Sequence, residues 1–132
     1  MIIQESKLLD NMTSRVFLGG FSQGSFVTLY ASHVLKEKIG GAIIISAFKS
    51  KIIDELPEKN ELPPTLVIHG AKDNIKTIDE AEIDLKHFFK RPNVKKIVID
   101  DLSHDLNNKQ ARTLISEFLR EKTSHQTTPA TM

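Results

Sequence analysis

The sequence predicts an α/β fold, in which a parallel sheet of about four strands forms the middle of three layers and helices flank it. Four short apolar runs, rich in β-branched residues, lie at residues 16–18, 42–45, 66–68 and 97–99. Helical patterns separate most of these runs. Strands that alternate with helices form right-handed crossover units, and such units build parallel sheets. Each run is continuous rather than alternating, which predicts strands that are buried on both faces.

Helical periodicity is clearest near the carboxyl terminus, where apolar residues recur at helical spacing. These residues are Ala111, Leu114, Ile115, Phe118 and Leu119. A second helix is predicted to begin at a capping box of Thr77 and Glu80 and to end before Pro92. A third is expected over residues 23–38, and residues 1–10 are compatible with a fourth. Predicted strands and helices therefore alternate over most of the length of the chain.

The chain has 132 residues, which is enough for one small domain. We expect that domain to occupy residues 1–122. Residues 123–132 are rich in threonine and show no periodicity, so we expect a disordered tail there. Residues 47–64 join two strands through a polar segment with three prolines, and any helix within it is expected to be short.

Composition excludes several classes of function. The 18 basic and 17 acidic residues are interspersed and give a net charge of +1, so we expect no nucleic-acid partner. The absence of cysteine excludes disulfides and thiolate metal sites. No apolar run approaches the roughly 18 residues of a membrane span, and the amino terminus does not resemble a secretory signal. We therefore expect a cytoplasmic protein without stable membrane insertion.

A candidate nucleophile lies at residues 20–24, which read Gly-Phe-Ser-Gln-Gly between a predicted strand and a predicted helix. In that context G-x-S-x-G forms a nucleophile elbow, a sharp turn that presents Ser22 above the sheet. We expect both Gly20 and Gly24 to be required, because side chains there would collide with the adjoining elements. The backbone amide of Gln23 would donate to an oxyanion. The same spacing also arises by chance in such turns.

A carboxylate and a histidine follow Ser22 in the chain order that is typical of this arrangement. Asp73 lies just beyond the strand at residues 66–69, and His104 follows the next strand. Because active groups of open α/β sheets gather at the carboxyl ends of the strands, we expect the three side chains to meet. His104 would take the proton of the Ser22 hydroxyl, while Asp73 would orient the imidazole and stabilise its cation.

Other carboxylates are also candidates for pairing with His104. Asp79 falls inside a predicted helix, whereas the carboxylates closest to His104 in the sequence are Asp100, Asp101 and Asp105. Asp73 is preferred to all of these because it lies past the carboxyl end of the strand that precedes the histidine's strand.

The remaining histidines have simpler interpretations. His69 ends a strand, which suggests a structural hydrogen bond that supports the turn containing Asp73. His33 and His87 fall within predicted helices and His125 within the predicted tail, so each is interpreted as a surface or packing residue. No cluster of histidines and carboxylates has convincing metal-ligand spacing, and we expect no metal.

These segments resemble those of the acyl-protein thioesterase, lysophospholipase and carboxylesterase family of α/β-hydrolases. Residues 20–24 look like its nucleophile segment, residues 64–75 like its strand-to-acid segment, and Ser103 with His104 like its histidine position. The similarity extends over about residues 1–121. It implies a partial α/β-hydrolase fold and hydrolysis of esters or thioesters of acyl chains without a cofactor. The implied substrates are acylated proteins, including palmitoylated ones, or lipid esters.

Three residues depart from the pattern of this family. Ser25 stands where the family usually has glycine after the elbow. Asp101 replaces a glycine that commonly precedes the histidine turn, which adds a carboxylate near His104. Lys76 replaces an aliphatic residue and is expected to make the rim of the site more polar.

A larger departure concerns the start of the sheet. Only 21 residues precede Ser22, which is too few for the several strands that open the sheet in this family. We therefore expect the second oxyanion amide to come from an upstream region. The strand around Val16 to Leu18 is expected to form an exposed apolar edge, and such an edge invites self-association. Two alternatives to an esterase or thioesterase stay open: a weak or inactive fragment that acts as a binding module, and a dienelactone-hydrolase-like enzyme.

Overall fold

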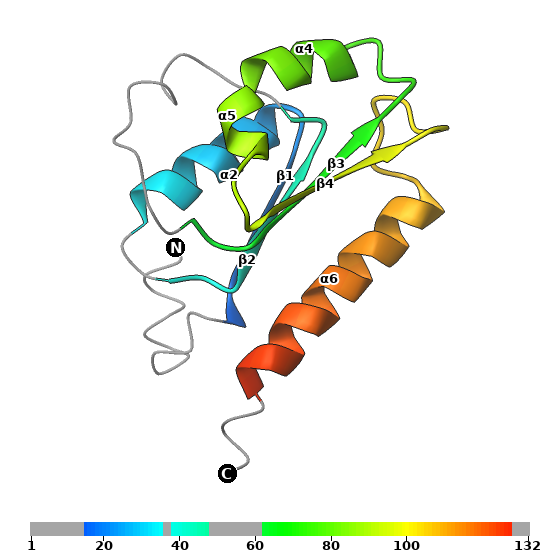
Figure 1. The fold of residues 1–132 in the computed structure, drawn as a ribbon. Coiled ribbons are helices and arrows are strands. Elements are labelled where there is room, and N and C mark those ends of the chain that lie inside the picture. Colours follow the sequence, from blue (N-terminus) through cyan, green and yellow to red (C-terminus); the bar gives the residue numbers. More distant parts are fainter. Residues whose placement is uncertain (1–14, 36–37, 48–61, 128–132) are drawn as a thin grey trace.

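The computed structural model describes residues 15–35, 38–47 and 62–127, which form an α/β structure of three layers (Figure 1). In these ranges the elements follow one another in the order β1 (Phe17–Phe21), α2 (Gln23–Val34), β2 (Gly41–Ile45), β3 (Thr65–Gly70), α4 (Ile78–Asp84), α5 (Lys86–Phe89), β4 (Val94–Ile99) and α6 (Lys109–Thr127). Helices α2, α4 and α5 lie on one face of the sheet, and α6 lies on the other (Figure 1).

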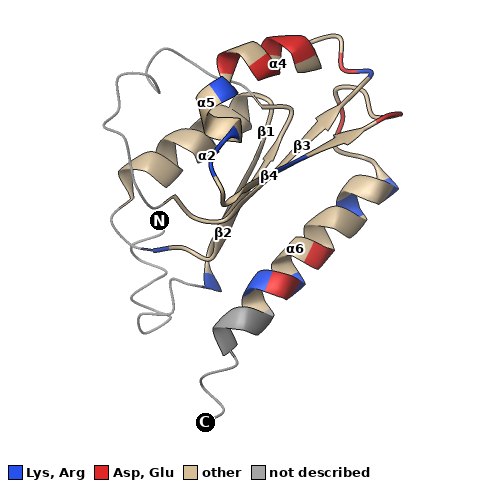
Figure 2. Ribbon diagram, in the orientation of Figure 1, with Lys and Arg blue, Asp and Glu red and all other residues tan. Residues whose placement is uncertain are grey.

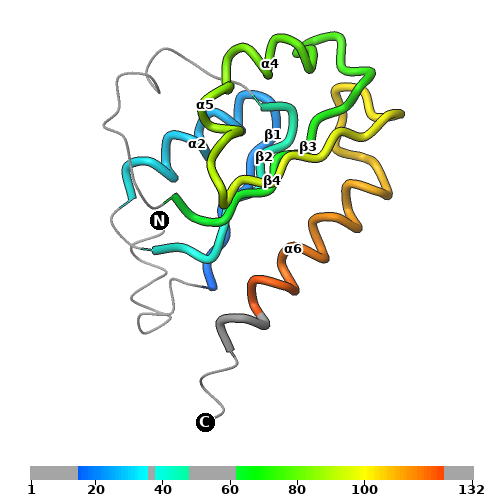
Figure 3. Tube along the Cα trace, in the orientation of Figure 1, coloured from blue at the N-terminus to red at the C-terminus, as the bar shows by residue number. Residues whose placement is uncertain are grey.

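The four strands pair side by side in sequence order, β1-β2-β3-β4, and every pairing is parallel. All four carboxyl ends therefore lie at the same edge of the sheet. The tube in Figure 3 shows that the loops after β3 and β4 come together at this edge. The predicted fold class, a parallel sheet of about four strands between helices, is confirmed.

Each face of the sheet has its own hydrophobic core. Under α6, side chains of the three strands β2, β3 and β4 pack against Ala111 and Phe118 of the helix. On the opposite face, Ile44 and Val67 pack with Leu29 of α2 and with Leu85, which lies between α4 and α5. Adjacent residues of one strand thus bury their side chains on opposite faces, as the continuous apolar runs predict.

Burial on both faces holds for the central strands but not for the outer ones. Every residue of β2 and β3 is buried. In β4 the side chains of Lys95 and Val98 are exposed, and β1 is only partly covered. The prediction is wrong for these two strands because, among the described residues, each has a neighbouring strand on one side only, and the helices cover a sheet edge incompletely.

The helices differ from the sequence predictions mainly at their ends. The capping box is confirmed, since Thr77 and Glu80 satisfy each other's backbone amides at the start of α4. Leu85, with φ −114° and ψ 23°, divides that predicted helix into α4 and α5. Helix α2 ends at Val34 because Leu35 is extended. Helix α6 continues to Thr127, so the first part of the expected tail is helical.

The possible helix at residues 1–10 lies outside the described residues, as does most of the segment at 47–64. In the part of the chain that the structure describes, no helix is both long and apolar enough to cross a membrane.

Candidate active site

The nucleophile turn connects β1 to α2 through a strained residue. Ser22 has φ 56° and ψ −117°, in a region that residues with a side chain rarely adopt. Its backbone amide donates to the carbonyl of Ile45 at 3.0 Å, which extends the pairing of β1 with β2 by one residue. The chain then turns at once into α2. A strained, well-anchored serine at the end of a strand is the geometry of a nucleophile elbow.

The two glycines that flank the nucleophile motif, Gly20 and Gly24, differ in how much space surrounds them. A Cβ atom at Gly20 would lie 2.0 Å from the carbonyl oxygen of Gly24 and 2.5 Å from Oγ1 of Thr28, so glycine is needed there. A Cβ at Gly24 would meet no heavy atom within 4 Å. The expectation that Gly24 is sterically required is therefore wrong, because its Cβ would point into open space and not toward β1.

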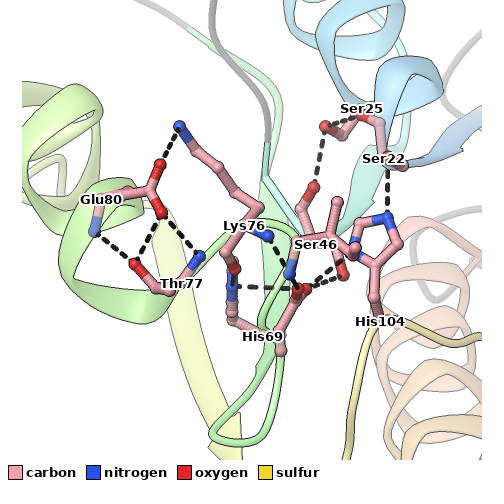
Figure 4. Close-up of polar contacts among 10 residues, drawn as sticks. Ser22, Ser25, Ser46, His69, Lys76, Thr77, Glu80 and His104 are labelled. Carbon is pink, nitrogen blue, oxygen red and sulfur yellow. Dashed lines mark hydrogen bonds and ion pairs between the residues drawn. The ribbon is translucent and has the colours of Figure 1, made fainter.

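His104 lies between Ser22 and Asp73 and contacts both side chains. Its Nε2 lies 2.9 Å from Oγ of Ser22 (Figure 4). Its Nδ1 lies 2.8 Å from Oδ2 of Asp73. With Asp73 ionised, Nδ1–H donates to the carboxylate and Nε2 is free to accept from the serine hydroxyl. The ring of Phe21 packs against the imidazole with centroids 4.9 Å apart. The structure thus brings together all three side chains that the sequence singled out.

Asp73 is the most heavily hydrogen-bonded group of the site and is only 3% exposed. Its Oδ1 accepts from the amides of Ile75 at 3.0 Å and Lys76 at 2.8 Å, and its Oδ2 accepts from Oγ of Ser46 at 3.0 Å and from His104. Burial raises the pKa of this carboxyl, but hydrogen bonds from Lys76, His104, Ser46 and Ile75 outweigh it and hold the pKa below its usual range. The carboxylate therefore stabilises the fold at neutral pH, and that contribution is lost as the pH falls through the lowered pKa.

His69 supports the same turn, as the sequence predicted. This side chain is 2% exposed, and its Nε2 donates to the carbonyl of Lys76 at 2.6 Å. Nε2 also lies 3.7 Å from Oδ2 of Asp73. Because the Lys76 amide binds Asp73 while the Lys76 carbonyl binds His69, the imidazole fixes the turn that holds the carboxylate.

Contacts between their backbones tie the loop of Asp73 to the loop of His104. The amide of Lys72 donates to the carbonyl of Leu102 at 3.0 Å. A Cβ at Gly70 would lie 2.0 Å from that same carbonyl oxygen, so the loops can approach this closely only because residue 70 is glycine. The acid and the histidine are thus placed by one interlocked pair of loops.

The other carboxylates do not pair with His104, and the Lys76 side chain contacts α4. Among the described residues no ion pair joins His104 to Asp100, Asp101 or Asp105, while its pair with Asp73 is direct. The Lys76 side chain is 13% exposed and pairs with Asp84 of α4. This ammonium group is therefore held against α4, and the expectation of a more polar rim stays a prediction.

The remaining predicted positions lie in helices or contribute their backbone. Asp79 lies in the first turn of α4. His33 contacts the carbonyl of Leu29 within α2, and His87 lies in α5. The side chain of His125 lies outside the described residues. Gln23 is the first residue of α2, and its amide has no acceptor within the ranges described.

Sequence reasoning missed Ser46, which donates to Asp73 from the end of β2. One signal was available, because Ser46 directly follows a continuous apolar strand, as Asp73 and His104 closely follow theirs. No group of three or more potential metal ligands gathers in the described ranges.

The contrast between the two glycines gives a testable prediction. Gly20→Ala is expected to lower the free energy of unfolding by about 2–3 kcal/mol, since a buried methyl must displace backbone. Gly24→Ala is expected to be no less stable than the natural chain, because alanine favours a helix over glycine by about 0.5–1 kcal/mol. Urea denaturation measures both. Equal losses from the two substitutions would contradict the steric assignment.

Comparison with known proteins identifies the family of this chain. Residues 2–123 match the family described as Phospholipase/Carboxylesterase. Acyl-protein thioesterase 1 homolog 2 of Dictyostelium discoideum is 34% identical over 80% of this chain and 50% of its own length. Carboxylesterase SOBER1 of Arabidopsis thaliana is 29% identical over 80% of this chain and 48% of its own length. The chain thus spans about half the length of these relatives.

Solved structures agree on the fold. The crystal structure of Arabidopsis thaliana SOBER1 superposes with a TM-score of 0.68 at 22% identity, covering 92% of this chain and 62% of that one. Esterase PE8 superposes with a TM-score of 0.73 at 23% identity, covering 91% and 56%. With residues 2–123 matched and the fold shared, the chain belongs to the phospholipase/carboxylesterase family of α/β-hydrolases.

Proposed function

We propose that this chain carries the reaction centre of a serine hydrolase that cleaves carboxylic esters or thioesters of acyl chains. The observation that carries the proposal is the unbroken contact from Oγ of Ser22 through His104 to Asp73. The family and the names of its members, acyl-protein thioesterase and carboxylesterase, support the same chemistry. Acylated proteins and lipid esters are the proposed substrates.

The proposed reaction has two halves. In the first, His104 Nε2 takes the hydroxyl proton as Oγ of Ser22 attacks the acyl carbonyl carbon, and the Gln23 amide faces the oxyanion that forms. Collapse of this intermediate breaks the bond to the leaving alcohol or thiol, which takes the proton from His104. In the second half, water attacks the acyl-serine ester while His104 again removes a proton. The acid is released, and Ser22 regains its hydroxyl proton.

Asp73 stays ionised through both halves. Its lowered pKa means that the carboxylate can stabilise the imidazolium of His104 without taking its proton. Because the amides of Ile75 and Lys76 hold Oδ1, the other oxygen keeps a fixed direction toward Nδ1.

Apolar side chains on the two catalytic loops support an acyl substrate. Ile75 follows Asp73 and is 69% exposed, and Leu106 follows His104 and is 49% exposed. Exposed aliphatic side chains on the loops that carry the acid and the base offer an apolar surface to an acyl chain.

Labelling with a fluorophosphonate tests the reaction centre. The natural chain is expected to gain one adduct, at Ser22, seen by intact-mass and peptide mass spectrometry. Ser22→Ala should gain none, and His104→Ala should react about 10²–10⁴-fold more slowly because the general base is lost. Ser32→Ala, which removes a buried serine hydroxyl of α2 away from the proposed reaction centre, is the control. Absence of labelling in the folded natural chain would favour the non-catalytic binding module.

Alkyl chain length tests the acyl preference. Ile75→Asn is expected to slow labelling by a long-chain fluorophosphonate about three- to tenfold while leaving a short-chain one unchanged, because apolar contact area is lost. Ile83→Asn, at a residue of α4 that is 77% exposed, is the control and should change neither rate. A loss that is independent of chain length would count against acyl contact at Ile75.

We further propose that the chain self-associates through β1. Among the described residues β1 forms one edge of the sheet and carries no charge or proline, whereas the opposite edge strand, β4, carries Lys95 and Lys96 (Figure 2). Lysines on an edge strand discourage pairing with another chain. Helix α2, which packs on β1, exposes apolar side chains at helical spacing: Val27, Tyr30 and Val34. A second copy of the chain would cover both the open edge of β1 and the apolar side chains of α2.

Placing a lysine on β1 tests this pairing. Gly19→Lys is expected to shift the chain from dimer to monomer in sedimentation velocity, because it gives β1 the same protection that β4 has. Gly19 has room for a side chain, since a Cβ there would have its nearest contact at 3.8 Å. Val98→Lys on β4 is the control and should leave the dimer intact. A natural chain that is monomeric at all accessible concentrations would refute the proposal.

A further inference from the structure

Strands β1 and β2 are each followed directly by a serine with a strained backbone. Ser22 has φ 56° and Ser46 has φ 57°, and these are the non-glycine residues with positive φ in the described ranges. Each uses its amide to extend the sheet, Ser22 toward Ile45 and Ser46 toward Ile68. A strained conformation persists only where its surroundings hold it, and it concentrates at functional sites. Ser22 is the proposed nucleophile, so a role for Ser46 remains to be found.

Ser46 connects the acid to the nucleophile turn by a route that avoids His104. Its side chain is fully buried, and its Oγ donates to Oδ2 of Asp73 at 3.0 Å. Its carbonyl faces the hydroxyl of Ser25 at 3.3 Å, and that hydroxyl also contacts the carbonyl of Ser22 (Figure 4). Ser25 is itself fully buried. Buried hydroxyls therefore join the backbone of Ser22 to the carboxylate of Asp73.

The presence of serine, and not glycine, at position 46 indicates that its hydroxyl group is needed there. Glycine would adopt φ 57° without strain, but glycine has no hydroxyl. Asp73 Oδ2 has two donors, Ser46 and His104, and they approach from different strands. With the Ser46 hydroxyl in place, one side of Oδ2 is occupied and the other is directed at Nδ1 of His104.

We propose that Ser46, anchored by Ser25, is a positioning residue that fixes the Asp73 carboxylate toward His104. This inference rests on the proposed function, because positioning matters to the reaction only if His104 acts as its base. Ser25 stands where resemblance to the family leads one to expect glycine, so its part of this connection is a feature of this chain.

Two substitutions at position 46 separate positioning from stability. Ser46→Gly removes the hydroxyl and relieves the strain, whereas Ser46→Ala removes the hydroxyl and keeps the strain. Both are expected to slow the maximal rate of fluorophosphonate labelling about tenfold without changing the half-saturating concentration, because a small misplacement of catalytic groups is costly. Both lose the hydrogen bond to Asp73, but Ser46→Ala is expected to lower the unfolding midpoint further than Ser46→Gly, because only glycine relieves the backbone strain. Labelling of Ser46→Gly at the natural rate would overturn the proposal.

Substitutions in α2 test the anchor. Ser25→Ala should slow labelling in the same way as Ser46→Gly but less, since it acts through the Ser46 backbone. Ser32→Ala removes a buried hydroxyl of the same helix, one that donates to the carbonyl of Thr28 at 2.8 Å, and should leave labelling unchanged. Equal slowing by the two alanines would mean that any loss in the helix is enough, and it would refute the anchoring role.

A spectroscopic measurement distinguishes failure of this inference from failure of the proposed function. The Nδ1–H proton of His104, observed by NMR in the resting protein, reports its hydrogen bond to Asp73 and needs no turnover. Ser46→Gly is expected to shift this resonance and to speed its exchange with water, while Ser32→Ala leaves it unchanged. If the natural chain does not label but the resonance responds, the hydrolase proposal fails and positioning stands. An unchanged resonance in Ser46→Gly refutes positioning.

Discussion

The buried carboxylate of Asp73 is the constraint on which the arrangement of the site depends. A carboxylate at 3% exposure would be protonated if its oxygens lacked partners, because burial disfavours its charge. Here the donors come from three parts of the chain: its own turn, the end of β2 and the loop after β4. Each donor that stabilises the charge is in turn held in place by it, so the ionised carboxylate is also what fixes these segments relative to one another.

Parallel pairing makes this convergence possible. With all strands in one direction, each strand-to-helix turn or loop of the site begins at the same edge of the sheet, and short turns suffice to bring side chains together. Close approach then depends on glycine at two places. Gly20 lets α2 start directly against β1, and Gly70 lets the acid loop contact the carbonyl of Leu102. A side chain at either position would separate groups that must lie within hydrogen-bond distance.

Ser22, Asp73 and His104 could be selected from sequence because each signal is local: a motif or a chemical group directly after an apolar strand, in a known chain order. The fold class followed from the same strands. Ser46 could not be assigned, because its role depends on a contact with Asp73 that only the folded sheet creates. Gly24 was misjudged for a related reason, since a steric requirement depends on which atoms lie opposite. The partial burial of β4 likewise results from its place at the edge of the sheet. The apolar run at residues 97–99 does not reveal which strand lies at the edge.

The contacts that hold the three proposed catalytic side chains are contained within residues 20–104, and they lie on the side of Ser22 that faces β2, β3 and β4. On the other side, β1 is the edge of the sheet that the described residues form, and α2 exposes Val27, Tyr30 and Val34. This fold therefore has two separate requirements to meet. One is to hold the proposed nucleophile, base and acid, and the other is to enclose a substrate. The first can be met by the described residues, because a hydrogen-bond network needs only its own donors and acceptors. The second depends on what covers the β1 side, since stabilisation of an oxyanion and binding of an acyl chain both need walls around Ser22.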